Sequence, residues 1–267
     1  MQHFSSGGVD IAYSDTAPAS PRVGDPAVLL IHGFASNAAA NWINTGWVRT
    51  LNEAGYRVLA IDNRGHGESE KLYALEQYGA PLMADDARRL LDHTGVKAAH
   101  VVGYSMGARI SAFLLLTHPG HVLSATFGGL GINMVRGMRG RGDTIAEALE
   151  APHIDDVTNP GARGFRSFAE QTHSDLKALA ACMRSARAPI TAEALSHVRV
   201  PVLVAVGTED EIAGSAAELA ALIPGAQFVD IQGRDHMKAS GDRAFKSAVL
   251  EFLEKTGRLP SSEARTL

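Results

Sequence analysis

The stretch Gly103-Tyr104-Ser105-Met106-Gly107 lies between two segments of different character. The apolar run 98–102 before it is typical of a buried strand, and the segment 108–118 after it has a helical pattern. A serine flanked by two glycines at a strand-to-helix turn forms a nucleophile elbow. The turn is so tight that the glycine positions can hardly carry side chains, and the strained serine backbone lifts its hydroxyl clear of the sheet. We therefore expect Ser105 to act as a nucleophile.

The composition sets broad limits on the rest of the chain. Its 267 residues, 45% of them hydrophobic and 20% charged, suit one sizeable domain with a true core. The net charge of −4 provides no electrostatic footprint for nucleic acid. The single cysteine, Cys182, excludes an internal disulfide and a cysteine-based metal site. With no signal-peptide pattern and no apolar stretch of 18 residues, we expect a cytoplasmic protein without membrane insertion.

Strand and helix patterns alternate along most of the chain. Helical patterns cover 47–54, 83–93 and 243–255, and this alternation predicts an α/β fold, a mostly parallel sheet with helices on both faces. The predicted strands are short apolar runs at 27–31, 56–61, 98–102, 124–127, 200–206 and 226–231.

One interval breaks this alternation. Between the strand patterns that begin at Ser124 and Val200 the chain has helical patterns but no clear strand, and a structureless connection of that length is unusual. We therefore predict a core formed by 1–131 and 191–267, with 132–190 inserted as a helical cap. Near its start, 136–142 carries three arginines that could bind an anion, although a solvated lid hinge is the simpler interpretation.

A serine nucleophile needs a base, an acid that orients the base, and backbone N–H groups that hold an oxyanion. Of the 11 histidines, His236 lies just past the last predicted strand, on the edge of the sheet where ligands bind open α/β folds. Most other histidines flank turns, end a helix or lie in or near the cap. We predict that His236 is the base.

The acid is expected in the loop after the preceding strand, which reads Gly207-Thr208-Glu209-Asp210-Glu211. Three adjacent carboxylates leave a choice. Asp210 has the usual offset from the glycine, so we predict it as the acid and assign Glu209 and Glu211 to solvated loop positions. The resulting order Ser, Asp, His differs from that of chymotrypsin-like and subtilisin-like enzymes.

The oxyanion is expected to bind the backbone N–H of Met106 and a second donor. The loop His32-Gly33-Phe34 follows the first predicted parallel strand, and the Phe34 N–H is the predicted partner. Trp42, Tyr104 and Phe34 are predicted walls of the substrate pocket. The chemistry requires no metal and no cofactor, because the triad supplies nucleophile, base and electrophile.

Together these motifs resemble the α/β-hydrolase superfamily, from about Phe4 to Leu253. The segment Asp62-Asn63-Arg64-Gly65-His66-Gly67-Glu68-Ser69 is similar to the D-x-R-G-x-G-x-S loop common in this family, where Asp62 and Arg64 would have structural roles. The resemblance implies the α/β-hydrolase fold and, within it, the serine-nucleophile, esterase-like branch. Members that open epoxides or dehalogenate alkanes use an aspartate where this chain has Ser105.

The resemblance thus implies a carboxylesterase-like enzyme acting on small to medium, mainly apolar esters, with a small-molecule ester as its partner. Three alternatives stay open. One is a carbon–carbon bond hydrolase of ring-cleavage dienoates, which uses the same triad and whose acidic substrate the cap arginines could serve. Another is acyl transfer to an acceptor other than water, such as peroxide or an alcohol. The last is a ligand-binding receptor that keeps the triad but turns over poorly.

Overall fold

The computed structural model describes residues 1–22, 24, 27–137 and 140–257. Its centre is an eight-stranded sheet in the order β1-β2-β4-β3-β5-β6-β7-β8. All pairs from β4 to β8 are parallel, whereas β1 pairs with β2, and β2 with β4, in the antiparallel sense. The strands are β1 (Gln2–Ser6), β2 (Val9–Thr16), β3 (Ala27–Ile31), β4 (Arg57–Ile61), β5 (Ala99–Tyr104), β6 (Val122–Gly128), β7 (Val202–Gly207) and β8 (Gln227–Ile231).

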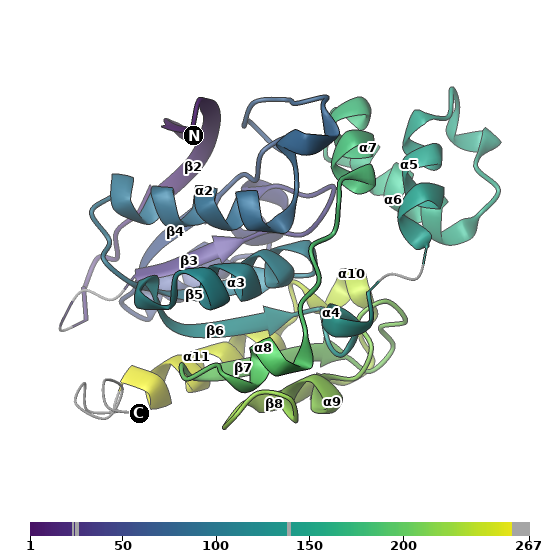
Figure 1. Ribbon diagram of the computed structural model, residues 1–267. Coiled ribbons are helices and arrows are strands. Elements are labelled where there is room, and N and C mark those ends of the chain that lie inside the picture. Colours follow the sequence, from purple (N-terminus) through teal and green to yellow (C-terminus); the bar gives the residue numbers. More distant parts are fainter. Residues whose placement is uncertain (23, 25–26, 138–139, 258–267) are drawn as a thin grey trace.

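Helices cover both faces of the sheet (Figure 1). Helices α2 and α3 pack on one face together with α9, and α1 and α11 cover the other face. The helices are α1 (Trp47–Glu53), α2 (Ala80–His93), α3 (Met106–Thr117), α4 (Asn133–Arg136), α5 (Arg141–Glu150), α6 (Pro160–Gln171), α7 (Leu176–Arg184), α8 (Ala192–Ser196), α9 (Ala216–Ala220), α10 (His236–Ala239) and α11 (Arg243–Gly257), with short turns η1 (Ala39–Ile43), η2 (Leu75–Gln77), η3 (Pro119–His121) and η4 (Ile154–Asp156).

The predicted α/β fold is confirmed, and all six predicted strands are present, with ends that differ from the prediction by at most two residues. The strands β3, β5 and β7 read as continuous apolar runs because both of their faces are fully covered. The hairpin of β1 and β2 was not predicted. In β1 only Phe4 and Ser6 are buried, so the strand alternates and its apolar content is too low to resemble the central strands.

Helices α4 to α8 fill the described part of the connection between β6 and β7, and no strand interrupts them there. Helices α5, α6 and α7 pack on one another and lie beyond the carboxyl ends of the parallel strands, at the upper right of Figure 1. Two side-chain hydrogen bonds tie this group to the core. The Thr172 hydroxyl donates to the Ala35 carbonyl at 2.8 Å, and the Tyr73 hydroxyl donates to the Asp175 carboxylate at 2.9 Å.

Of the arginines near the start of the predicted cap, Arg136 is exposed and pairs with Glu218 at 2.6 Å. Arg139 and the side chain of Arg141 lie outside the described residues. Over the ranges given above, no helix combines the length and hydropathy that a bilayer crossing requires.

Candidate active site

The turn between β5 and α3 presents Ser105 in a strained conformation. Its φ of 54° and ψ of −111° place a non-glycine residue in a region that L side chains rarely adopt. The two flanking glycines are sterically required. A Cβ on Gly103 would lie 2.2 Å from the Gly107 carbonyl oxygen, and one on Gly107 would lie 1.9 Å from the Ile31 carbonyl oxygen. The sequence pattern therefore reflects the close approach of three backbone segments.

Ser105, His236 and Asp210 are joined by two hydrogen bonds. The Ser105 hydroxyl lies 2.9 Å from Nε2 of His236, and Nδ1 of His236 lies 2.7 Å from Oδ2 of Asp210. A carboxylate only accepts hydrogen bonds, so Nδ1 carries the ring proton and Nε2 can accept the proton of the serine. The structure thus brings the three predicted residues together although 131 residues separate Ser105 from His236.

The loop after β7 holds Asp210 in place. Its Oδ1 accepts the backbone N–H groups of Ile212 and Ala213, at 2.8 and 2.9 Å, which leaves Oδ2 for His236. Gly207 permits the approach of the two loops, since a Cβ there would lie 2.0 Å from the Arg234 carbonyl oxygen. The neighbouring Glu209 is exposed and makes no contact with His236.

The two predicted oxyanion donors flank Ser105. The loop after β3 approaches the elbow closely, because a Cβ on Gly33 would lie 3.3 Å from the Tyr104 carbonyl oxygen and 3.5 Å from Cβ of Ser105. Met106 is the first residue of helix α3, so its N–H cannot donate to a carbonyl of the same helix. Within the described residues, neither this N–H nor that of Phe34 has a hydrogen-bond acceptor. Both are therefore available to an oxygen atom placed between them.

Asn41 supports the oxyanion loop and was not anticipated from the sequence. Its Oδ1 accepts the N–H of Gly33 at 3.1 Å, directly before the Phe34 donor. The side chain is buried, and its Nδ2 has no partner in the described structure. No local sequence pattern indicates this role for Asn41, because the contact depends on how η1 folds back onto the loop at Gly33.

The D-x-R-G-x-G-x-S loop stabilises the backbone beside the site. The Asp62 carboxylate accepts the N–H groups of Ala38 and Glu68, at 2.7 and 2.8 Å, and so links this loop to the oxyanion loop. Arg64 forms a buried, two-pronged ion pair with Asp86, at 2.7 and 2.8 Å. These contacts agree with the structural roles that the resemblance implied.

Three buried histidines away from the triad are held neutral. His32 donates from Nδ1 to the Gly33 carbonyl at 2.7 Å and accepts the N–H of Asn63 at Nε2. Burial lowers the pKa of His32 to about 4 and that of His66 to about 3. Burial also lowers the pKa of His100, on β5, to about 4.

These histidines predict a loss of stability in weak acid. In the unfolded chain each histidine has a pKa of about 6.5, whereas in the native protein it stays neutral to lower pH. As pH falls below about 6.5, proton binding therefore stabilises the unfolded state relative to the native one. Each should lower the free energy of unfolding by about 2 kcal/mol between pH 7.5 and pH 5. Urea unfolding at both pH values measures this. We expect a smaller decrease for His100→Asn than for the wild type, and an unaltered one for His197→Asn, whose side chain is exposed. An unaltered decrease in both variants would contradict the assignment.

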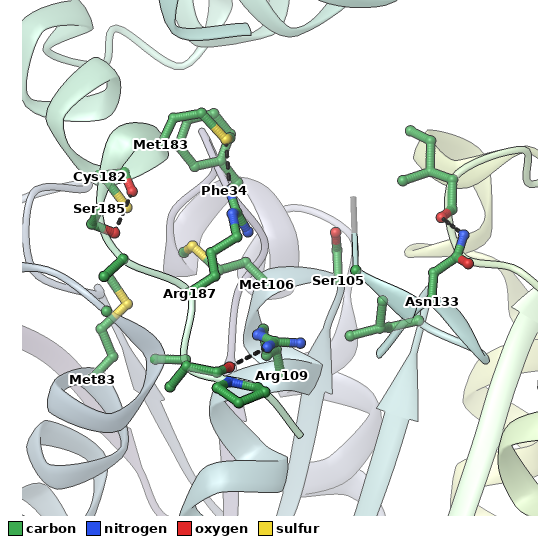
Figure 2. Close-up of a pocket in the computed structure, with 18 of the residues that line it drawn as sticks. Phe34, Met83, Ser105, Met106, Arg109, Asn133, Cys182, Met183, Ser185 and Arg187 are labelled. Carbon is green, nitrogen blue, oxygen red and sulfur yellow. Dashed lines mark hydrogen bonds between the residues drawn. The ribbon is translucent and has the colours of Figure 1, made fainter. Parts of the chain in front are cut away.

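Two cavities meet at Ser105. The first, of about 280 Å³, runs between the elbow and helices α6 and α7 and is lined mainly by apolar side chains, among them Met83, Met106, Leu130 and Phe165 (Figure 2). The second, of about 360 Å³, lies on the other side of Ser105 and is lined by residues that include His236, Tyr104, Asn41 and Phe168. Phe34 and Phe165 border both, with ring centroids 6.0 Å apart. A bound molecule could therefore extend in two directions from the serine.

The structure places the three aromatic residues predicted as pocket walls in different environments. Phe34 lines both cavities. Tyr104 lines the second, and its hydroxyl donates to the His236 carbonyl at 2.5 Å, which also supports the base. The prediction for Trp42 is wrong, because its ring is fully buried against Trp47 in the core under α11 and borders neither cavity. The core removes the whole Trp42 ring from water, whereas a position in a cavity wall would leave part of it accessible.

The structure also reveals two arginines that the sequence did not indicate as site residues. Arg109 lies four residues after Ser105 on α3, and Arg187 follows α7; both line the first cavity. The separation of 78 residues between them gives no local pattern. In the described ranges no group of three or more histidine, cysteine or carboxylate side chains is placed to hold a metal ion.

Comparisons with known proteins agree with this architecture. A family profile described as alpha/beta hydrolase fold matches residues 26–136. Rhodomycin D methylesterase DauP of Streptomyces sp. (strain C5) is 40% identical over 111 residues, 40% of this chain and 37% of that protein. Epoxide hydrolase B of Mycobacterium tuberculosis is 33% identical over 124 residues, 43% of this chain and 33% of that protein. The matches thus span little more than a third of these two relatives.

Likeness of structure extends further along the chain. A hydrolase from Pseudomonas aeruginosa PA01 superposes with a TM-score of 0.78, covering 94% of this chain and 97% of that one at 23% identity. The profile covers the oxyanion loop, the D-x-R-G-x-G-x-S loop and the serine elbow, and the shared fold includes the strands that precede Asp210 and His236. The chain therefore has the α/β-hydrolase fold.

Proposed function

We propose that this protein hydrolyses carboxylic esters of small to medium, mainly apolar substrates through an acyl-enzyme on Ser105. The observation that carries the proposal is the chain of hydrogen bonds from Ser105 through His236 to Asp210, beside two backbone N–H groups without an acceptor. A nucleophile, an oriented base and an anion site beside one another are the parts that acyl transfer requires.

In the proposed reaction, Ser105 Oγ attacks the ester carbonyl while its proton passes to Nε2 of His236. The Phe34 and Met106 N–H groups hold the oxyanion of the tetrahedral intermediate, and Asp210 stabilises the charged imidazole. As the intermediate collapses, the carbon–oxygen bond to the alcohol breaks and His236 protonates the leaving oxygen. His236 then takes a proton from water, which attacks the acyl-enzyme, and the acid leaves as Ser105 regains its proton.

The similarity to a methylesterase supports ester hydrolysis, and the similarity to an epoxide hydrolase favours a different reaction. The nucleophile position favours the first, because epoxide-opening members use an aspartate where this chain has Ser105. All five tyrosines also lie before the cap, whereas epoxide openers hold the epoxide oxygen with cap tyrosines. We also propose that 132–190 acts as the lid, since Phe165, Cys182 and Met183 from this segment close the first cavity.

Labelling with a fluorophosphonate, followed by steady-state kinetics on 4-nitrophenyl butyrate, tests the function. We expect one equivalent of probe on Ser105, mapped by mass spectrometry, and steady turnover in the unlabelled protein. Labelling at a different residue would contradict the proposal. A burst of one equivalent without further turnover would favour a ligand-binding receptor, and product analysis with added alcohol or peroxide would detect transfer to an acceptor other than water.

A second candidate reaction follows from the arginines in the first cavity. Arg109 and Arg187 suit an anionic ring-cleavage dienoate, which is cleaved at a carbon–carbon bond by the same triad. Comparing kcat/KM for a dienoate and for simple esters separates the two reactions, and a clear preference for the dienoate would replace the ester proposal.

A further inference from the structure

The first cavity carries two positive charges and, among the described residues that line it, no negative one. Arg109 comes from α3 and Arg187 from the segment after α7, so core and cap contribute one charge each. Figure 2 shows both guanidinium groups on the same side of Ser105, with Met183 and Phe34 nearby. The other lining side chains are mainly apolar.

The two arginines differ in how they are held. Arg109 donates to the backbone carbonyl groups of Met134 and Ala188, which fixes its guanidinium at the cavity floor. Arg187 has one hydrogen-bond acceptor in the described structure, the Met183 sulfur at 2.8 Å, and a thioether is a weak acceptor. Neither arginine forms an ion pair with a described carboxylate. Most donors of Arg187 are therefore available to a ligand.

The surroundings are unfavourable for two uncompensated cations. Burial lowers the pKa of Arg187, and burial together with the charge of Arg187 lowers that of Arg109. Arg187 keeps exposed surface and is one of the residues that line the cavity. An anion between the two groups would relieve their repulsion and fill the free donors, and a carboxylate matches the planar fork of a guanidinium.

The triad determines which part of an ester reaches these arginines. His236 must protonate the leaving oxygen, so the alcohol lies on the side of its Nε2. His236 lines the second cavity and not the first, whereas Met106 and Arg109 line the first. The alcohol therefore occupies the second cavity, and the acyl chain extends into the first, toward Arg187.

We propose that the first cavity is an acyl subsite for a chain that ends in a carboxylate, which Arg187 binds with Arg109 beside it. This inference rests on the proposed ester hydrolysis and makes it more specific: the preferred substrates are half-esters of aliphatic dicarboxylic acids. The cavity of about 280 Å³ lies near the lower limit of small-molecule sites and suits a short chain.

Two matched substrates test the subsite: the 4-nitrophenyl half-ester of adipic acid and the same ester with a terminal carboxamide. They have nearly the same size and differ in charge. We expect the wild type to prefer the acid, and Arg187→Gln to lower kcat/KM for the acid by about 10- to 100-fold while changing that for the amide less than about threefold. Arg187→Lys should retain part of the preference. Arg184→Gln is the control, because Arg184 ends α7 three residues before Arg187 but pairs with Glu150 and does not line the cavity.

A binding experiment separates failure of the subsite from failure of the ester reaction. In Ser105→Ala protein, saturation-transfer NMR with monomethyl adipate should detect binding that Arg187→Gln abolishes and Arg184→Gln preserves. If the wild type hydrolyses neither ester but this binding is observed, the subsite stands and the ester reaction fails. Equal effects of Arg187→Gln on acid and amide, or equal binding with and without Arg187, would overturn the subsite.

Discussion

Ser105→Ala is expected to lower kcat for a simple ester by at least about 10⁴-fold while the protein stays folded. The substitution removes the attacking oxygen and leaves the oxyanion donors, so only the residual rate from binding and electrostatics remains. Alanine fits the same backbone, and the lost hydrogen bond to His236 should change the free energy of unfolding by about 1 kcal/mol. Steady-state kinetics on 4-nitrophenyl butyrate together with urea unfolding measures both effects.

Contamination by host esterases is the main confounding source of residual rate in that experiment. Ser196→Ala, an exposed position on α8, purified in parallel, should retain wild-type activity and provides the reference. If the folded Ser105→Ala protein keeps the wild-type rate, Ser105 is not the nucleophile and the proposed function fails.

Asp210→Asn is expected to reduce kcat by about 10⁴-fold, whereas Glu209→Gln should stay within about threefold of the wild type. The Asp210 Oδ1 position accepts two backbone N–H groups, so an asparagine keeps its carbonyl there and turns its NH₂ toward His236. That NH₂ is a donor, so Nδ1 must become the acceptor and Nε2 must carry the proton. Nε2 then cannot accept the proton of Ser105.

The pair of variants also tests the choice between Asp210 and its neighbour Glu209. Both remove one negative charge from the same loop, so a general electrostatic effect would slow both alike. A large loss in Glu209→Gln with little loss in Asp210→Asn would contradict the geometry. Rates on a neutral ester from pH 6 to 9, with circular dichroism as the check on folding, provide the measurement.

The central strands and the triad could be predicted because their signals are local. The strands β3, β5 and β7 are buried on both faces and therefore read as unbroken apolar runs. Ser105 and Asp210 follow two of these strands, β5 and β7, and His236 follows the edge strand β8. Parallel strands bring their carboxyl ends to one edge of the sheet. The glycines at 103, 107 and 207 mark places where a side chain would collide with another backbone segment.

Other features could not be read from local patterns. The β1 strand alternates, so its two buried positions were too few to be recognised. Trp42 and Phe34 are both apolar rings after the same strand, yet one packs in the core and the other lines two cavities. Composition does not distinguish these outcomes, because the hydrophobic effect favours both and the packing of α1 and α11 selects between them.

The chemistry of the proposed reaction thus follows from residue types in a fixed order along the chain, since each group is placed by the strand that precedes it. The proposed preference for an anionic acyl chain depends instead on Arg109 and Arg187, which line one cavity only because the segment after α7 folds back to α3. Neither arginine has a carboxylate partner among the described residues. Whether a charged side chain has a partner depends on three-dimensional packing. A sequence lists the charges, but only folding shows which of them remain uncompensated.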